Sequence, residues 1–377
     1  MLSHNQVLRR LLSECAVSTK RIAVVGAGVN GVSIATACAS LGHQVQLFDE
    51  STPFDQTSSA SSRMLHGGIR YIEQGHIGLV REALIERDGW LRFAPNATRV
   101  ERFYFPVYHG SKRGRWLLFA GTLIYQWLAG RFSIGPSQLH SSEDLKHVFP
   151  SLIPQGLCGG ASYCDVVMEY EPLIQRLVDE ARKQGVRIVE NTRIERLYSD
   201  GRIDTAHQTL EFDRVINAAG PWAAKLLEAS DVDSGFTIDH VRGSHLIVQA
   251  SFPHALVLQT PGERRIIFVI PLDPEHVLLG TTEQKHDISD PIVCTDAESA
   301  YLLEILNQHL SEPLAASDIV SSFAGVRPIV RPRDTAPGDI SSASRDSEIE
   351  ISDRLISVFG GKWTSARHLG GKVAALV

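Results

Sequence analysis

Cysteine is scarce in this chain, and clusters of metal-binding side chains are lacking. Only 5 cysteines occur among 377 residues, and no two of them stand in a Cys-x-x-Cys arrangement. Because a disulfide framework needs paired cysteines, this odd number fits reduced thiols in the cytoplasm better. No histidine, cysteine and aspartate residues have the spacing of metal ligands, so we expect no metal.

Long apolar runs are lacking as well. Residues 1–19 contain Arg9 and Arg10 followed by only two leucines, which is too little for the apolar core of a signal peptide. We expect this N-terminal extension to be a short capping or frayed helix. The longest apolar run, 116–129, is shorter than the roughly 20 residues that a membrane-spanning helix needs.

An excess of positive charge is the third absence. The formal net charge of −6 argues against a nucleic-acid partner, although a local basic pocket remains compatible with it. Hydrophobic residues make up 43% of the chain and charged residues 21%, which is ordinary for a globular protein. The length suggests two domains with a sizeable buried core.

One stretch near the N-terminus carries the strongest pattern that is present. The apolar run Ile22–Val25 predicts a buried strand, then a turn and a helix follow, and 45–48 predict a second strand. The turn has three glycines in the spacing Gly-x-Gly-x-x-Gly. Gly26 permits a tight turn, Gly28 lets a pyrophosphate approach the backbone, and Gly31 lets helix and strand pack closely.

An acidic residue follows the second strand. Asp49 stands where a carboxylate accepts hydrogen bonds from an adenosine ribose, and the helix N-terminus before it favours a pyrophosphate anion. Glycine-rich turns are common, so a plain strand–turn–helix connection is the alternative interpretation. Strand, turn, helix, strand and carboxylate in this order favour dinucleotide binding.

The rest of the chain mixes two rhythms. Residues 79–93 and 171–184 predict helices, and 193–212 predict a β-meander. The region 241–282 is rich in strand patterns and predicts an antiparallel sheet. A late strand at 355–359, followed by a glycine turn, indicates that the chain returns to its first domain.

Six stretches together resemble one known family, the flavin-dependent glycerol-3-phosphate dehydrogenases of the D-amino-acid-oxidase-like superfamily. Their order and approximate spacing match that family from about residue 20 to the end. The stretches are VGAGVNG (25–31), TSSASSRMLHGGIRY (57–71), NAAGPWA (217–223), RGSH (242–245) with GTT (280–282), GVRP (325–328) with SRD (344–346), and FGGKWT (359–364).

The resemblance implies an α/β fold with a Rossmann-like FAD-binding domain built from discontinuous segments, and a substrate domain with a mixed or antiparallel β-sheet. The FAD-binding segments are expected at 20–100, 160–235 and 350–377, and the substrate domain at 101–159 and 236–349. Larger members of the family carry a further C-terminal helical domain, so this chain looks like a short form. Ser365 and Ala366 also depart from the threonine and tyrosine expected there.

The resemblance further implies which residues contact FAD, which we expect to be bound noncovalently. A serine-rich loop close to the ribose carboxylate can offer hydroxyls and N–H groups to the phosphates and the ribityl chain. The expected cofactor-binding residues are Gly26, Gly28, Gly31, Asp49, Thr57, Ser58, Ser59, Gly220, Gly361, Lys362 and Thr364.

The implied reaction is oxidation of sn-glycerol 3-phosphate to dihydroxyacetone phosphate, with electrons passed to a quinone. A phosphate dianion calls for arginine forks and lysine charges. By resemblance, Arg327 and Arg345 grip the phosphate. Arg70, Tyr71 and Lys362 then lie nearer the reacting carbon, with Arg70 and Lys362 also given catalytic roles. The simpler interpretation of each cation is a solvated surface charge.

Two histidines are candidates for the catalytic base, and the sequence leaves both open. Motif position distinguishes His66 and His245 from the other histidines of the chain, and imidazole accepts a proton near neutral pH. A rival reading keeps the flavin but has the arginines hold the carboxylate of another hydroxy or amino acid. A further rival is a non-catalytic flavoprotein.

The apolar run at 116–129 has two interpretations. It follows a basic cluster at 112–115 and carries tryptophan at or near both ends, which suits a segment lying in the membrane interface. A buried helix of the substrate domain is nearly as well supported. A quinone acceptor favours the first interpretation, with the protein in the cytoplasm and peripheral on the inner face of the membrane through 112–129.

Overall fold

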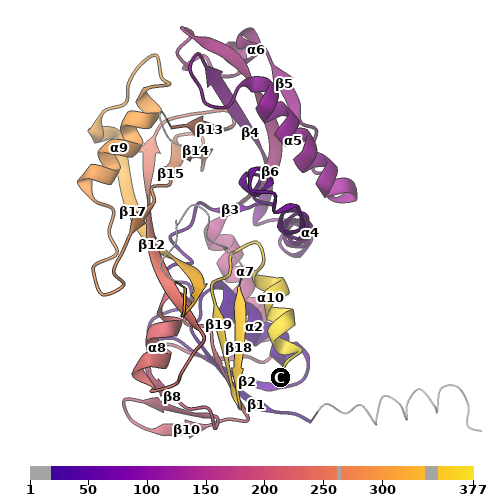
Figure 1. The fold of residues 1–377 in the computed structure, drawn as a ribbon, viewed down its shortest axis with the longest axis vertical. Coiled ribbons are helices and arrows are strands. Elements are labelled where there is room, and N and C mark those ends of the chain that lie inside the picture. Colours follow the sequence, from indigo (N-terminus) through magenta and orange to yellow (C-terminus); the bar gives the residue numbers. More distant parts are fainter. Residues whose placement is uncertain (1–17, 261–264, 336–346) are drawn as a thin grey trace, which may run out of the picture.

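The computed structural model describes residues 18–260, 265–335 and 347–377. The helix expected within the first residues and the predicted phosphate ligand Arg345 lie outside these ranges. Two large sheets dominate the molecule, and they lie in its lower and upper parts in Figure 1. The expected α/β class with a Rossmann-like part and a mixed-sheet part is confirmed.

The first sheet has six strands, and the strand of the glycine motif lies inside it. Its order is β18-β19-β11-β1-β2-β7, and all neighbouring pairs are parallel except β18 with β19. The strands are β1 (Arg21–Val25), β2 (Gln44–Phe48), β7 (Arg187–Val189), β11 (Arg214–Asn217), β18 (Glu348–Ser352) and β19 (Leu355–Phe359). The predicted late strand therefore does return to the first sheet.

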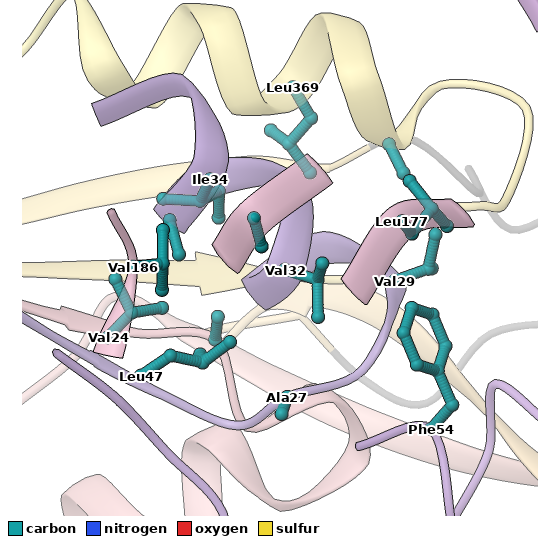
Figure 2. Close-up of a cluster of buried hydrophobic side chains, with 14 of the residues drawn as sticks. Val24, Ala27, Val29, Val32, Ile34, Leu47, Phe54, Leu177, Val186 and Leu369 are labelled. Atoms are coloured by element: carbon teal, nitrogen blue, oxygen red, sulfur yellow. The ribbon is translucent and has the colours of Figure 1, made fainter. Parts of the chain in front are cut away.

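Alternation along β1 divides the core between the two faces of this sheet. Ile22 and Val24 pack into one apolar cluster, and Ala23 and Val25 pack into another. The helices that contribute to the first cluster are α2 (Val29–Ser40), α7 (Tyr170–Lys183) and α10 (Ala366–Ala374), as Figure 2 shows around Val24. The second face is covered by α8 (Ala223–Ala229) and by the meander β8 (Ile194–Leu197), β9 (Arg202–Thr205) and β10 (Thr209–Glu211).

The second sheet has ten strands and is mostly antiparallel. Its main path is β16-β12-β15-β14-β13-β4-β6-β3, while β17 pairs with β12 and β5 pairs with β6. The strands are β3 (Met64–Leu65), β4 (Thr98–Tyr108), β5 (Gln138–His140), β6 (Leu157–Met168), β12 (Phe236–Gln249), β13 (Ala255–Gln259), β14 (Ile266–Pro271), β15 (His276–Gly280), β16 (Gln284–Lys285) and β17 (Ile319–Pro332).

Long strands join the two parts of the molecule. β12 and β17 pair from Phe236 with Pro332 to Val248 with Ile319, and in Figure 1 this pair rises from beside the six-stranded sheet toward α9 (Asp296–Asn307). The expected domain boundary at residue 160 falls inside β6. Because β6 pairs with β4 along nearly all of its length, it belongs to the ten-stranded sheet as a unit.

Helices lie on the β4–β6 side of this sheet. They are α3 (Arg70–Glu73), α4 (Ile77–Phe93), α5 (Arg115–Ala129) and α6 (Ser142–Val148). Helix α5 covers the predicted apolar run and is only half packed. It buries Thr122, Tyr125 and Ala129, whereas its outer face exposes apolar side chains. Among the described residues, no helix is both long enough and apolar enough to cross a membrane.

Candidate active site

A cavity of about 610 Å³ lies at the carboxyl ends of four parallel strands of the six-stranded sheet. Its walls include the glycine turn after β1, Asp49 after β2, Thr192 after β7 and the 218–222 segment after β11. Ligands of doubly wound sheets bind at this edge, where the strands end in loops. The position of the cavity agrees with the dinucleotide site that the sequence predicts.

The three motif glycines are placed where a larger residue would not fit. Gly26 has φ +98°, and a Cβ there would lie 2.6 Å from the carbonyl oxygen of Ala218. A Cβ on Gly31 would lie 1.7 Å from the Gly26 oxygen. A Cβ on Gly28 would lie 3.0 Å from Ser58 Oγ. The turn, the helix start and the 57–71 segment are thus packed against one another.

Asp49 is fixed in place by its own backbone surroundings. Its Oδ2 accepts a hydrogen bond from Ala27 N at 2.6 Å, and its Oδ1 accepts one from Ser51 N at 2.9 Å. The carboxylate therefore braces the glycine turn while it lines the cavity. The sequence predicts only the ribose contact, and the bond to the turn adds a structural role.

The segment 57–71 runs from the cavity to the ten-stranded sheet. Ser58 Oγ accepts a hydrogen bond from Val29 N at 3.0 Å, so this serine satisfies one of the first N–H groups of α2. Ser59 donates to Gln56 O at 2.6 Å and is not among the cavity-lining residues. Thr57 lines the cavity, and its buried Oγ1 has no hydrogen-bond partner among the described residues.

The far end of this segment meets the C-terminal glycine turn. Thr364 Oγ1 accepts a hydrogen bond from His66 N at 3.1 Å. Lys362 Nζ lies 4.6 Å from the centre of the Tyr71 ring, which is a cation–π distance. Arg70 precedes Tyr71 at the start of α3, so these predicted residues are gathered in one region.

Gly361 and Gly220 occupy turns beside the glycine-rich helix start and the cavity. Gly361 has φ +97°, and a Cβ there would lie 2.4 Å from Asn30 Nδ2, which donates to Gly360 O at 3.0 Å. Gly220, with φ +56°, lines the cavity. The hydroxyl of Thr364 is engaged with the backbone of His66, and a direct contact of this threonine with the cofactor remains a prediction.

Arg327 is held at the centre of β17 by neighbours from the β15–β16 turn. Its Nη2 donates to Thr281 Oγ1 at 3.0 Å, and its Nη1 lies 3.9 Å from Glu283 Oε1. The side chain is 29% exposed, so the guanidinium is partly reachable. Glu283, which is not among the predicted site residues, balances part of its charge.

His245 lies one strand away from Arg327 and is fully buried. Burial, followed by the positive charges of Arg327 and Arg63, lowers the pKa of His245 to about 3. Its Nε2 shares a 2.9 Å hydrogen bond with Ser62 Oγ, and its ring stacks on Phe323. The buried Nδ1 has no partner among the described residues. The structure thus holds a neutral imidazole beside the predicted phosphate-binding arginine.

Several residues of this region carried no clear sequence signal. Ser62 binds His245, Thr281 binds Arg327, and Trp363 Nε1 donates to Ser58 O at 3.0 Å. All three lie inside motifs that the family resemblance named, so their neighbourhood was identified although their partners were not. Within the described residues, no group of three or more histidine, cysteine, aspartate or glutamate side chains could hold a metal ion.

The residues around the cavity fit a flavin dinucleotide. The close-packed glycine turn and the small residues Ala218 and Ala219 leave backbone groups accessible to phosphate and ribose oxygens. The Oγ1 of Thr57, which has no hydrogen-bond partner among the described residues, is a further group available to them. The cavity lining does not include His66, Arg70, Arg327 or Lys362. His66 and Arg70 instead lie in the 57–71 segment, Arg327 lies on β17, and Lys362 lies in the turn after β19.

Comparisons with known proteins agree with this geometry. The family model described as FAD dependent oxidoreductase (DAO) matches residues 21–376. A glycerol-3-phosphate dehydrogenase of Pseudomonas aeruginosa is 35% identical over 366 residues, which cover 92% of this chain and 69% of that protein. The D-erythritol 1-phosphate dehydrogenase of Brucella abortus is 30% identical and is covered to 71%, with 92% of this chain matched.

A solved structure shows the same fold. The glycerol-3-phosphate dehydrogenase of Bacillus halodurans complexed with FAD superimposes with a TM-score of 0.74 at 23% identity. The match covers 98% of this chain and 66% of that one, so this chain spans about two thirds of the length of such relatives. The chain belongs to the FAD-dependent oxidoreductase family, in its glycerol-3-phosphate dehydrogenase branch, and its cofactor is FAD.

Proposed function

We propose that this oxidoreductase oxidises sn-glycerol 3-phosphate to dihydroxyacetone phosphate and passes the electrons to a quinone. The observation that carries the proposal is that a partly exposed guanidinium, Arg327, and a neutral buried imidazole, His245, lie on neighbouring strands, near enough for the arginine charge to lower the pKa of His245. Oxidation of a phosphorylated secondary alcohol needs an anchor for a dianion and an acceptor for the hydroxyl proton. These two side chains supply one of each.

Arg327 suits a phosphate better than a solvated surface role. Its guanidinium donates a hydrogen bond to Thr281 and lies near the Glu283 carboxylate, and these contacts orient it before substrate binds. Arg345 was predicted to share the phosphate and lies outside the described residues. Arg70, Tyr71 and Lys362 are proposed to surround the reacting carbon from the other side.

His245 is proposed as the base, with His66 as the alternative. At neutral pH the ring carries no proton on one nitrogen, so it can accept one. Burial and the neighbouring arginines oppose the imidazolium form. A phosphate dianion beside Arg327 would offset that positive field, and bound substrate would then raise the basicity of the ring. FAD, when bound, supplies the hydride acceptor.

Two other substrates share parts of this chemistry. The Brucella abortus relative is named for D-erythritol 1-phosphate, which has the same phosphate and a longer polyol. An arginine could also hold the carboxylate of a hydroxy or amino acid, whose charge is smaller. We favour glycerol 3-phosphate because relatives named for it reach the higher identity of 35%.

The deciding experiment compares two arginines of one strand. Under anaerobic conditions, glycerol 3-phosphate should bleach the flavin of the wild type, whereas Arg327→Ala should lower kcat/KM by roughly 10²–10³-fold with an unchanged flavin spectrum. Arg331, four residues along β17 and paired with Asp239, is the control, and Arg331→Ala should react normally. Normal turnover by Arg327→Ala would refute the phosphate assignment, and no bleaching of the wild type by any polyol phosphate would support the carboxylate or non-catalytic alternatives.

Contact with a lipid surface is the second part of the proposal. Quinones reside in the lipid, and α5, whose first residue is the basic Arg115, presents an outward apolar face after Lys112 and Arg113. At 15 residues and about 1.5 Å per residue, α5 extends only about 22 Å, which suits a helix lying along the interface. The protein is proposed to be cytoplasmic and peripheral on the inner face of the membrane.

A further inference from the structure

A buried polar network connects α5 with the loop 66–69, which holds the predicted catalytic residue His66 and leads to Arg70. Asp165 on β6 is 1% exposed, and its Oδ2 accepts a hydrogen bond from the Tyr125 hydroxyl at 2.6 Å. Its Oδ1 lies 3.2 Å from Arg87 Nη1, and Arg87, also 1% exposed, donates through Nη2 to Phe132 O at 2.8 Å. Strand β6, α4 and α5 thus meet at one carboxylate, and Arg87 also reaches the short 3₁₀ helix Gly130–Phe132 that follows α5.

The network fixes the direction of the tyrosine hydroxyl. Burial, together with the Asp165 charge, raises the pKa of Tyr125 well above its usual value, so the phenol keeps its proton. Asp165 accepts that proton in its hydrogen bond, and the lone pairs of the phenol oxygen are left for another donor. Since Arg87 stays charged, Asp165 stays a good acceptor in this buried setting.

The donor to that oxygen is a backbone amide of the loop. Gly67 N donates to Tyr125 Oη at 2.7 Å, and the contact is buried. A Cβ on Gly67 would lie 2.5 Å from the same oxygen and 2.6 Å from Leu84 Cδ2, so the loop can approach only because this residue is glycine. Gly67 follows His66 directly, whose own N–H is bound to Thr364 Oγ1.

The residues that follow Gly67 pack against predicted site residues, so the position of Gly67 affects them. A Cβ on Gly68 would lie 2.4 Å from the Tyr71 ring, against which Lys362 Nζ stands. A shift at Gly67 therefore moves the groups on both sides of it. His66 lies before the anchored amide, and Arg70 and Tyr71 lie after it. None of the side chains in the network of Arg87, Tyr125 and Asp165 lines the large cavity.

We propose that Tyr125 is a positioning residue: held by Asp165 and Arg87, it anchors Gly67 N and so sets the geometry of His66, Arg70 and Tyr71 for oxidation of the polyol phosphate. This inference rests on the proposed function. Tyr125 belongs to α5, the helix whose outer face is exposed and apolar. The hydrogen bond from Gly67 N to Tyr125 therefore links that helix to the site.

The test is Tyr125→Phe in the FAD-loaded protein, with two readouts. Hydrogen–deuterium exchange should rise in the peptide spanning 64–71, because Gly67 N loses its acceptor. In steady-state kinetics kcat for glycerol 3-phosphate should fall on the order of tenfold, while KM and FAD content stay unchanged, since Arg327 is untouched. A purely structural role would lower stability without this split between kcat and KM.

The control is Tyr108→Phe, which removes a half-buried hydroxyl that donates to Ile153 O at 3.1 Å. It should leave exchange in 64–71 and kcat unchanged.

If Tyr125→Phe does not fold, a second variant replaces it. Arg87→Lys keeps the charge beside Asp165 but loses the guanidinium fork that reaches Phe132 O, and it should raise exchange and lower kcat as well. Exchange and kcat at wild-type values in a folded variant would overturn the proposal, as would loss of FAD together with a raised KM. A wild type that glycerol 3-phosphate does not reduce would refute the proposed function, while the exchange experiment would still decide the role of Tyr125.

Discussion

Burial of His245 has a measurable consequence for stability. Its folded-state pKa is about 3 and its ordinary value is 6.5, so between these pH values the unfolded chain binds a proton that the native state excludes. Stability is therefore unaffected by this group above about pH 7 and is lost as pH falls through 6.5. From pH 7.5 to pH 5.0 the loss amounts to about 2 kcal/mol.

We expect His245→Gln to remove this part of the pH dependence. The free energy of unfolding, measured by denaturant titration at pH 7.5 and 5.0 with FAD present, should fall by about 2 kcal/mol less in the variant than in the wild type. His207→Gln changes an exposed imidazole and serves as the control. Equal pH slopes in the wild type and His245→Gln would show that the native state protonates this ring.

At the scale of single residues, the sequence predicted types of group better than their partners. The sequence predicts Asp49 as a ribose ligand, but its bond to Ala27 N depends on how the turn folds. The sequence also predicts Ser58 as a cofactor ligand; it lines the cavity, and its hydroxyl in addition accepts a hydrogen bond from the first turn of α2. Hydroxyls have several possible partners, and only tertiary structure decides among them.

Among the elements, α5 shows how far periodicity reaches. The apolar run was predicted, and its two interpretations each describe one face of the helix. Tyr125 and Ala129 are buried, while Trp116, Leu117 and Trp127 are exposed, the last by 77%. An apolar run on every side of a helix hides which face packs, because the stripe that meets the protein and the stripe that meets solvent have the same residue types.

The exposed face should bind anionic lipid. Replacing Trp116, Leu117 and Trp127 together by serine removes apolar area that is not packed in the fold, so the protein should move from sedimented phosphatidylglycerol vesicles to the supernatant while FAD stays bound. Lys112 and Arg115, at the start of the helix, add about 1 kcal/mol each near anionic lipid, whereas Arg113 is already ion-paired with Glu73. Salt should therefore weaken binding of the wild type.

The matched control replaces three exposed apolar residues elsewhere, Val293, Val320 and Ile351, by serine. This triple variant should sediment with vesicles as the wild type does. Equal vesicle binding by both triple variants would contradict a lipid role for α5. Loss of FAD and of solubility in the α5 variant would indicate instead that this face is packed in the native protein.

On the scale of the whole molecule, the cofactor site is built from parts that are far apart in the sequence. The glycine turn, the 57–71 segment, the 218–222 segment and the late turn after β19 converge beside α2. The motif at 21–50 predicted the first of these because it is local. The other contacts follow from sheet order, in which β19 lies beside β11 and β11 beside β1, and no local pattern specifies that order.

Because FAD joins these segments, its binding should stabilise the entire fold. Acid or heat should release intact FAD into the supernatant, since we expect no covalent bond. Adding FAD to the apoprotein should raise Tm further as the FAD concentration increases above Kd. At 100 times Kd, binding adds about 2.7 kcal/mol to the free energy of unfolding. Flavin that stays with precipitated protein would contradict noncovalent binding.

Two glycine-to-alanine variants, one in α2 and one in α4, distinguish an effect on FAD binding from an effect on general stability. Gly31→Ala places a Cβ 1.7 Å from the Gly26 oxygen, so the turn must shift, and the protein should lose FAD and its response of Tm to added FAD. Gly89→Ala places its Cβ in open space within α4, where alanine favours the helix by about 0.5–1 kcal/mol. That variant should keep full FAD content, visible in its absorbance spectrum, and should melt slightly higher. A Gly31→Ala protein with normal FAD content would show that the close contact of turn and helix does not form the cofactor site.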